Sequence, residues 1–377
     1  MKQEKHNRSG LREVKRVVVK VGSRLLAGEN GVVDQTLISR IVDQISVLKE
    51  QGIEVLLVTS GAIVAGRQEL GMKRRPSSLP GLQAAAAVGQ AILMHIYQKN
   101  FKKAGYCVGQ ILLTRDGLHH RDRHLNVRHT LQTLLTKGVI PIINENDTVS
   151  VDEIKFGDND RLAALVANLI RADLLILLTD VDGLLSSSGP VRSGEVIHQV
   201  DSITPEIIGL IEDTDNEHSR GGMRSKIEAA EIVTRAGGRV IIAGGSRANI
   251  LTDIIAGKEV GTYFPTGFSR MRSRKCWIAF SCLKQGRIIV DAGARRALIE
   301  KGTSLLASGI LEVEGDFKSG DMISIVDESR EEFCRGLVNY SSAELEKIRG
   351  KKTEKFESIL GYKYYDEAVH RDNLLIL

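Results

Sequence analysis

Short apolar runs alternate with amphipathic stretches over most of the chain. The apolar runs predict strands at 17–21, 53–58, 108–113, 139–143, 174–178 and 239–242. The amphipathic stretches predict helices at 34–50, from 62 onward, and at 82–103, 125–137, 160–171 and 223–236. Strands that are apolar throughout are typical of a parallel sheet covered on both faces. We therefore expect an α/β fold, a three-layer αβα sandwich with a mainly parallel, doubly wound sheet.

The pattern changes after about residue 264. Residues 266–285 contain several arginines and lysines but no acidic residue, and they predict a basic connector. Beyond it, short apolar runs predict strands at 287–290, 309–313, 322–325 and 335–340, with one helix at 293–301. We expect a first domain at 14–265 and a small, mostly β domain at 286–368.

The composition is ordinary for a globular protein. The 377 residues are 42% hydrophobic and 26% charged, with a net charge of +5. That charge is too small for this length to indicate a nucleic-acid or membrane partner. The four cysteines have no CxxC or zinc-like spacing, and we expect no leader or membrane-length apolar stretch. These features predict a cytoplasmic protein with reduced thiols and no membrane association.

The first predicted strand contains a lysine. Lys20 lies within the apolar run, and Gly22 and Ser23 follow it directly. A charge inside a buried strand is costly unless another group compensates it. Lys20 could bind a phosphate at the carboxyl end of the strand, or it could reach solvent along its own aliphatic stem. The strand alone leaves both interpretations open.

Polar side chains also follow the second and fourth predicted strands. Ser60 and Gly61 precede a predicted helix whose first amides could bind an anion, although Ser60 could instead be a simple helix cap. Asn144, Asn146 and Asp147 follow the fourth strand. Amides and a carboxylate together could hold the ammonium and carboxylate groups of an amino acid. They could equally form an Asx turn.

Two further strand-to-helix segments carry acids. Asn159 and Asp160 open the helix predicted at 160–171. Asp160 could orient lysines by charge pairing or approach a metal through water, or it could simply favour the helix dipole. Thr179 and Asp180 follow the fifth strand, where they could bind a nucleotide or magnesium, or form part of a turn.

A glycine pair precedes the helix predicted at 223–236. The stretch consists of Arg220, Gly221, Gly222, Met223, Arg224, Ser225 and Lys226. We expect the helix to begin after the glycines, with Lys226 in its first turn, where an anion offsets the unfavourable dipole. This predicts a phosphate cradle. Neither GxxxxGK[ST] nor GxGxxG occurs in the chain, which excludes a P-loop and a Rossmann dinucleotide site.

Together these residues resemble the amino acid kinase family, in particular its glutamate-phosphorylating members. The matching stretches are Val18–Ser23, Val58–Ile63, Ala87–Gln90, Leu113–Asp116, Ile143–Asp147, Gly157–Asp160, Leu178–Asp180, Gly221–Lys226 and Ala368–Asp372. The second domain resembles a PUA domain, a small β-rich module. The resemblance implies transfer of phosphate from ATP to the γ-carboxylate of L-glutamate, with Mg²⁺, giving γ-glutamyl phosphate as the first step of proline biosynthesis. It also implies proline feedback and a homo-oligomer.

The resemblance assigns roles to the residues singled out above. Lys20 and Lys226 would neutralise the transferred phosphate, and Asp160 would orient them. The glutamate-binding residues would be Ser60, Gly61, Asn144, Asn146, Asp147 and Asn159. The ATP-binding residues would be Lys20, Gly22, Ser23, Thr179, Asp180 and the stretch 220–226, in which Arg220 replaces the family's usual threonine. No protein ligand for a metal is predicted.

Two alternatives remain open. Another kinase of the same fold could act on aspartate or acetylglutamate, which the Asn144–Asp147 stretch and the second domain disfavour. An RNA-binding or regulatory protein could retain an inactive kinase-like domain, which the presence of Lys20, Asp160 and Lys226 disfavours. The segment 286–377 has slightly more acidic than basic residues, so it lacks the basic footprint that RNA binding needs.

Overall fold

The computed structural model describes residues 8–28, 32–114, 117–118, 121–149, 159–186, 194–212, 217–266 and 284–377. The chain divides into two compact units near residue 270. Almost all of the predicted basic connector at 266–285 lies outside the described residues, as do Gly157 and Asp158.

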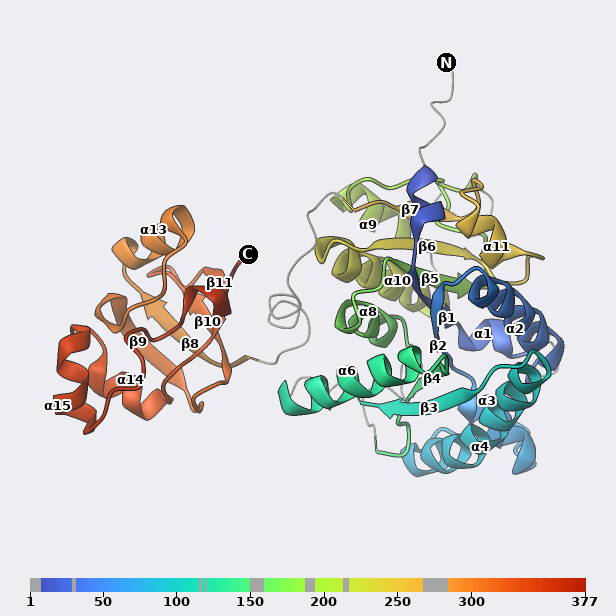
Figure 1. The fold of residues 1–377 in the computed structure, drawn as a ribbon, viewed down its shortest axis with the longest axis horizontal. Coiled ribbons are helices and arrows are strands. Elements are labelled where there is room, and N and C mark those ends of the chain that lie inside the picture. Colours follow the sequence, from blue (N-terminus) through green and yellow to red (C-terminus); the bar gives the residue numbers. More distant parts are fainter. Residues whose placement is uncertain are drawn as a thin grey trace, which may run out of the picture. The chain divides into compact units, whose positions relative to one another are not determined.

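The first unit is built on a seven-stranded sheet with the order β3-β4-β2-β1-β5-β6-β7 (Figure 1). The strands are β1 Arg16–Val21, β2 Glu54–Val58, β3 Val108–Leu113, β4 Ile140–Glu145, β5 Leu174–Thr179, β6 Arg239–Gly244 and β7 Thr262–Phe264. All neighbours pair in parallel except β6 and β7. The predicted doubly wound sheet is confirmed. The order reverses at β1, which places the ligand crevice expected of such sheets at the carboxyl end of β1.

Helices cover both faces of this sheet. They are α1 Ser23–Leu26, α2 Gln35–Glu50, α3 Ala62–Glu69, α4 Leu79–Lys103, α6 Arg121–Thr136, α8 Asp160–Leu169, α9 Pro205–Glu212, α10 Glu217–Arg235 and α11 Ile250–Ile255, after a short 3₁₀ helix, η1, at Ser9–Glu13. On one face, α2 packs against β2, α4 and α11. On the other, α8 packs against β1 and β5, and α10 packs against α8 and β6.

The alternation of side chains along β1 explains where its lysine points. Val17, Val19 and Val21 belong to the fully buried core that includes α2, α4 and α11. Because successive side chains of a strand face opposite sides, Lys20 lies on the face covered by α8. The first residue of α8 is Asp160. The strand pattern therefore directs a lysine at an acid that is far away in sequence.

Helix α10 corrects one sequence-based expectation. It begins at Glu217, so Gly221 and Gly222 lie inside the helix instead of before it, and Lys226 is not in its first turn. A glycine inside a helix costs about 1 kcal/mol relative to alanine. Burial of Ala229, Ala230 and Val233, in a helix that packs against α8 and β6, offsets that local cost.

Two glycines join α3 and α4 backbone to backbone. A Cβ atom at Gly66 would lie 1.7 Å from the carbonyl oxygen of Ala85. A Cβ atom at Gly89 would lie 1.8 Å from the carbonyl oxygen of Ala62. Neither distance is possible for a real side chain, so this crossing requires glycine at both positions. Helix α4 thereby fixes the position of the beginning of α3.

Helix α4 also corrects the expectation that no stretch reaches membrane length. Among the described residues it is the one helix whose length and composition would allow it to span a bilayer. Its apolar character has a different physical origin, because its Leu93, Tyr97 and Phe101 are fully buried in the core of the first unit.

The second unit is a five-stranded sheet with the order β12-β11-β10-β8-β9. Its strands are β8 Lys284–Val290, β9 Ile310–Gly315, β10 Met322–Val326, β11 Glu332–Leu337 and β12 Leu374–Ile376. Its helices are α13 Ala292–Lys301, α14 Ser342–Ile348 and α15 Phe356–Leu360, with 3₁₀ helices η2 Ala307–Gly309, η3 Thr353–Lys355 and η4 Arg371–Asn373. Tyr340 and Phe356 meet edge to face in its core. The predicted small, mostly β domain is confirmed.

Candidate active site

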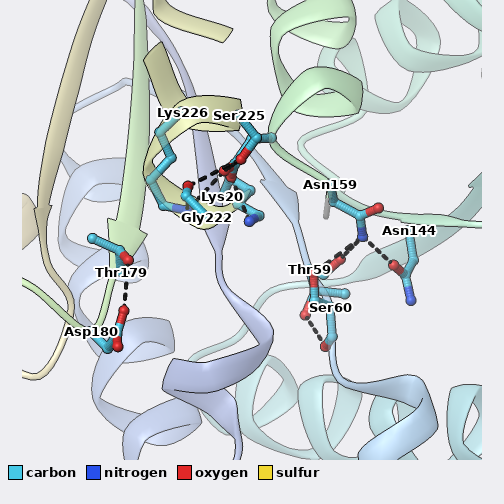
Figure 2. A network of polar contacts seen from close by, with 11 residues as sticks. Lys20, Thr59, Ser60, Asn144, Asn159, Thr179, Asp180, Gly222, Ser225 and Lys226 are labelled. Atoms are coloured by element: carbon cyan, nitrogen blue, oxygen red, sulfur yellow. Dashed lines mark hydrogen bonds and ion pairs between the residues drawn. The ribbon is translucent and has the colours of Figure 1, made fainter. Parts of the chain in front are cut away.

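Three charged side chains meet beneath the carboxyl end of β1 (Figure 2). Lys20 Nζ lies 2.5 Å from Asp160 Oδ1, and Lys226 Nζ lies 2.9 Å from Asp160 Oδ2. The exposed fractions of the side chains are 3% for Lys20, 8% for Lys226 and 0% for Asp160. Lys20 therefore does not extend along its stem into solvent. We call Lys20, Asp160 and Lys226 the lysine–aspartate cluster.

The lysine–aspartate cluster carries one more positive than negative charge. Burial alone would raise the pKa of Asp160, but the adjacent ammonium groups of Lys20 and Lys226 outweigh burial and hold this pKa well below its usual range. The carboxylate is therefore ionised at neutral pH. With both lysines charged, a buried site of this kind favours an anion, because an anion balances the excess positive charge.

Neighbouring groups on α10 hold the cluster in place. Lys226 Nζ also donates to the carbonyl oxygen of Gly222 at 2.8 Å, and the Ser225 hydroxyl donates to Asp160 Oδ2 at 2.9 Å. Arg224 instead forms an exposed ion pair with Glu228 at 3.3 Å. The predicted Arg220, Gly221 and Met223 also lie on α10, and the side chain of Arg220 is outside the described part of the chain.

A network of uncharged side chains lies beside the cluster. The Asn159 amide nitrogen Nδ2 is within hydrogen-bonding distance of the Thr59 carbonyl oxygen (2.7 Å), Asn144 Oδ1 (2.7 Å) and Ser60 Oγ (3.2 Å). Asn144 donates in turn from Nδ2 to Gln90 Oε1 at 2.7 Å. We call Gln90, Asn144, Asn159 and Ser60 the amide network. Asn144 lies within β4 and not after it, which corrects the predicted strand end.

A cavity of about 200 Å³ opens next to the amide network. Its lining residues are Ser23, Arg24, Ala27, Ser60, Gly61, Ala62, Ile63, Val64, Arg67, Arg75, Asn144, Glu145, Asp147 and Asn159. Five of the six predicted glutamate-binding residues are among them. The sixth, Asn146, is not, and its side chain accepts a hydrogen bond from Thr148 at 2.6 Å.

The cavity lining also contains three arginines that the sequence did not single out, Arg24, Arg67 and Arg75. Glu145, from the stretch Asn144–Asp147, lines the cavity as well. Arginines on short helices and loops are usually solvated, so no sequence pattern distinguished these three from others in the chain.

The two glycines at the strand ends differ in backbone geometry. Gly61 has φ of +96°, a left-handed conformation that favours glycine, and it occupies the N-cap position of α3. Ser60 is therefore not the helix cap that the sequence left open. The Gly22 amide donates to the Leu178 carbonyl at 3.1 Å, so it joins the ends of β1 and β5.

Thr179 and Asp180 lie at the end of β5. The Thr179 hydroxyl donates to Asp180 Oδ1 at 3.0 Å. Figure 2 shows this pair on one side of the lysine–aspartate cluster, and Ser60, Asn144 and Asn159 of the amide network on the other. The strand order β4-β2-β1-β5 gives the same sequence of sites along the sheet edge. The cluster thus separates two polar regions, one of which adjoins the cavity.

Comparisons with known proteins agree with this architecture. Residues 15–244 match the profile of the amino acid kinase family, and residues 286–360 match that of the PUA domain. The glutamate 5-kinase of Thermoanaerobacter sp. (strain X514) is 47% identical over 96% of this chain and 98% of its own length. The glutamate 5-kinase of Moorella thermoacetica is 47% identical over 99% of both chains. The resemblance stated from sequence is confirmed, and this chain belongs to the amino acid kinase family.

Proposed function

We propose that this protein transfers the γ-phosphoryl group of ATP to the side-chain carboxylate of L-glutamate. The products are ADP and γ-glutamyl phosphate, and the reaction is the first step of proline biosynthesis. The observation that carries the proposal is the buried, net positive lysine–aspartate cluster beside a cavity that has polar and charged residues in its lining. Relatives similar to this chain over nearly its full length are named glutamate 5-kinases, which favours glutamate over aspartate or acetylglutamate.

Catalysis by this arrangement requires charge and position but no general base. The glutamate γ-carboxylate has a pKa near 4 and is ionised at neutral pH, so it can attack phosphorus directly. Lys20 and Lys226 stabilise the negative charge on the phosphoryl oxygens during transfer, and Asp160 holds both ammonium groups in place before substrate arrives. The inactive-domain alternative is disfavoured because every member of the cluster is present and paired.

The cavity offers complementary groups for an amino acid with two carboxylates. In the proposal, Asp147 accepts hydrogen bonds from the α-ammonium group, and the arginines that line the cavity attract the carboxylates. Ser60, Gly61, Asn144 and Asn159 bind the remaining polar atoms. Asn146 does not line the cavity and its Oδ1 accepts from Thr148, so the proposal gives it no direct contact with the substrate.

The nucleotide is proposed to bind on the opposite side of the cluster. Thr179 and Asp180, with Gly22 and the stretch 220–226, form the proposed ATP region. Ser23, which the resemblance also assigned to ATP, lies in the lining of the cavity. Among the described residues, no three histidines, cysteines, aspartates or glutamates are grouped so that they could hold a metal ion. In the proposal, the phosphates of ATP, water and at most one or two carboxylates hold Mg²⁺. Bound in this way, Mg²⁺ would neutralise phosphate charge.

Three further properties belong to the proposal. A cytoplasmic location agrees with the free thiols of Cys107 and Cys334. Proline feedback and a homo-oligomer are carried only by the family resemblance. RNA binding by the second unit is not proposed, because the segment 286–377 has slightly more acidic than basic side chains.

Trapping of the acyl phosphate tests the proposed reaction. Purified protein with Mg-ATP and hydroxylamine is offered glutamate, aspartate or acetylglutamate in separate reactions, and the hydroxamate is measured. We expect hydroxamate with glutamate and at most a small fraction of that rate with the other two. Hydroxamate formed mainly from aspartate or acetylglutamate, or from none of the three, would contradict the proposal.

A further inference from the structure

The segment Ala87–Gln90 of α4 has no role in the reaction described so far. Its last residue, Gln90, is not among the residues that line the cavity. Gln90 nevertheless begins a chain of hydrogen bonds that reaches the cavity. Its Oε1 accepts from Asn144 Nδ2 at 2.7 Å, and Asn144 Oδ1 accepts from Asn159 Nδ2 at 2.7 Å. Both asparagines line the cavity.

The direction of this chain is set by a backbone group. The amide N–H of Glu145 donates to Asn144 Oδ1 at 2.9 Å, and a backbone N–H can only donate. The oxygen of Asn144 therefore faces Glu145 and Asn159, and its NH₂ group faces Gln90. Gln90 must therefore accept the hydrogen bond from Asn144 Nδ2 with its own side-chain oxygen. Its own Nε2 is left buried without a hydrogen-bond partner among the described residues.

An unsatisfied buried donor costs free energy, commonly more than a formed hydrogen bond contributes. Gln90 therefore adopts the orientation in which its oxygen accepts from Asn144, although this orientation leaves its own NH₂ group unsatisfied. The preceding residue, Gly89, lets α4 approach the backbone of Ala62 in α3, another residue of the cavity lining. Adjacent positions of α4 thus hold two separate parts of the cavity wall.

We propose that Gln90 is a positioning residue for the amino-acid substrate. It holds the Asn144 amide in one orientation, and Asn144 in turn holds the Asn159 amide at the cavity wall. Gln90 does not itself touch the substrate. This inference rests on the proposed function, because it assigns the substrate to the cavity that Asn144 and Asn159 line.

Two substitutions at one position separate orientation from packing. Gln90→Met keeps the length of the side chain but removes the acceptor. Gln90→Glu keeps an acceptor oxygen in either protonation state, because a carboxylate and the carbonyl of a carboxylic acid both accept from Asn144 Nδ2. The matched control is Gln98→Met, the same change at an exposed position of the same helix. Gln90→Ala, which favours helix, replaces Gln90→Met should the latter not fold.

The readouts are the glutamate dissociation constant without ATP, measured by calorimetry, and the steady-state KM and kcat of the full-length protein. For Gln90→Met we expect the dissociation constant and KM for glutamate to rise about tenfold. The kcat and the KM for ATP should change by less than about threefold. Gln90→Glu should recover most of the affinity, and Gln98→Met should match the wild type.

Failure of this inference differs from failure of the proposed function. A wild-type protein that does not bind glutamate overturns both. A wild-type protein that binds glutamate, with Gln90→Met binding equally well, overturns the positioning role alone, whatever the melting temperature of the variant. Gln90→Glu as weak as Gln90→Met would also overturn it, because the acceptor would then not be what matters.

Discussion

The lysine–aspartate cluster and the amide network lie side by side but are built from different chemistry. The cluster holds formal charges that are almost fully buried, with one positive charge in excess. The amide network consists of neutral side chains, and two hydrogen bonds of 2.7 Å link Gln90, Asn144 and Asn159. An unbalanced buried charge has a large free-energy cost, whereas a lost neutral hydrogen bond costs about 1 kcal/mol.

This difference separates two tasks. The charged region suits the transition state, whose negative charge it can balance, so changes there should alter turnover. The neutral region suits recognition of the ground state, so changes there should alter substrate affinity. The predictions below test that separation, beginning with the largest expected effect.

Replacement of Asp160 should have the largest effect. Asp160→Asn leaves two buried lysines without a counter-charge, so we expect kcat to fall about 10³-fold and stability to fall by about 3–5 kcal/mol. Because the folded-state pKa of Asp160 is lowered, its stabilising contribution is present above about pH 4 and is lost as pH falls through the folded pKa. Urea unfolding of wild type and variant should therefore converge at acidic pH. Equal stability at pH 7 would contradict the buried ion pairs.

The two lysines should show the opposite effect on stability. Lys20→Met or Lys226→Met leaves one lysine paired with Asp160, a neutral pair, so the melting temperature should stay level or rise. Turnover should nevertheless fall about 10²- to 10³-fold, with KM for glutamate within about threefold of wild type. Hydroxamate kinetics and thermal unfolding measure both. Unchanged turnover in either variant removes that lysine from the mechanism.

Asp147 should affect affinity and not turnover. Asp147→Asn keeps the shape of the side chain but removes the proposed partner of the substrate ammonium group. A hydrogen bond to a charged group contributes about 1.5–3 kcal/mol, so KM for glutamate should rise roughly 10- to 100-fold. An equal loss of kcat would show that Asp147 contributes to turnover, as the lysine–aspartate cluster does, and not only to substrate binding.

Replacement of Tyr97 should give the smallest effect on activity, and its measurable effect should be on stability at high pH. Its hydroxyl contacts Thr59 Oγ1 at 2.9 Å, and burial raises its pKa to about 12. A raised pKa means that the stabilising contribution is complete below pH 10 and is lost as pH rises toward 12. Between pH 10 and 12, wild type should lose about 2–3 kcal/mol more unfolding free energy than Tyr97→Phe. Parallel pH curves for the two proteins would show that Tyr97 does not titrate in this way.

Much of the fold could be predicted because its strands are continuous apolar runs. Lys20 was conspicuous for the same reason, as a charge within such a run. Its pairing with Asp160 could only be proposed from sequence. Asp160 and Lys226 are distant from it in the chain, and they meet through the packing of α8 and α10. The start of α10 was predicted wrongly because glycines normally end helices, and tertiary contacts outweighed that preference here.

The roles of Gln90 and the cavity arginines could not be recognised from sequence alone. Gln90 lies on an alanine-rich helix, where a glutamine usually faces solvent, and its role depends on Asn144 in a different strand. Arg24 and Arg67 are on separate helices, α1 and α3, and both line the cavity. The spacing of these arginines along the chain does not indicate that they line one cavity.

The glycine contacts between α3 and α4 also restrict how the site can move. Because the two backbones touch at Gly66 and Gly89, the helices cannot slide past or separate from one another without losing that contact. We therefore expect them to move as one unit, together with Ala62, Ile63 and Val64 of the cavity lining. A closure around a substrate that keeps this crossing intact must then move other lining residues toward α3.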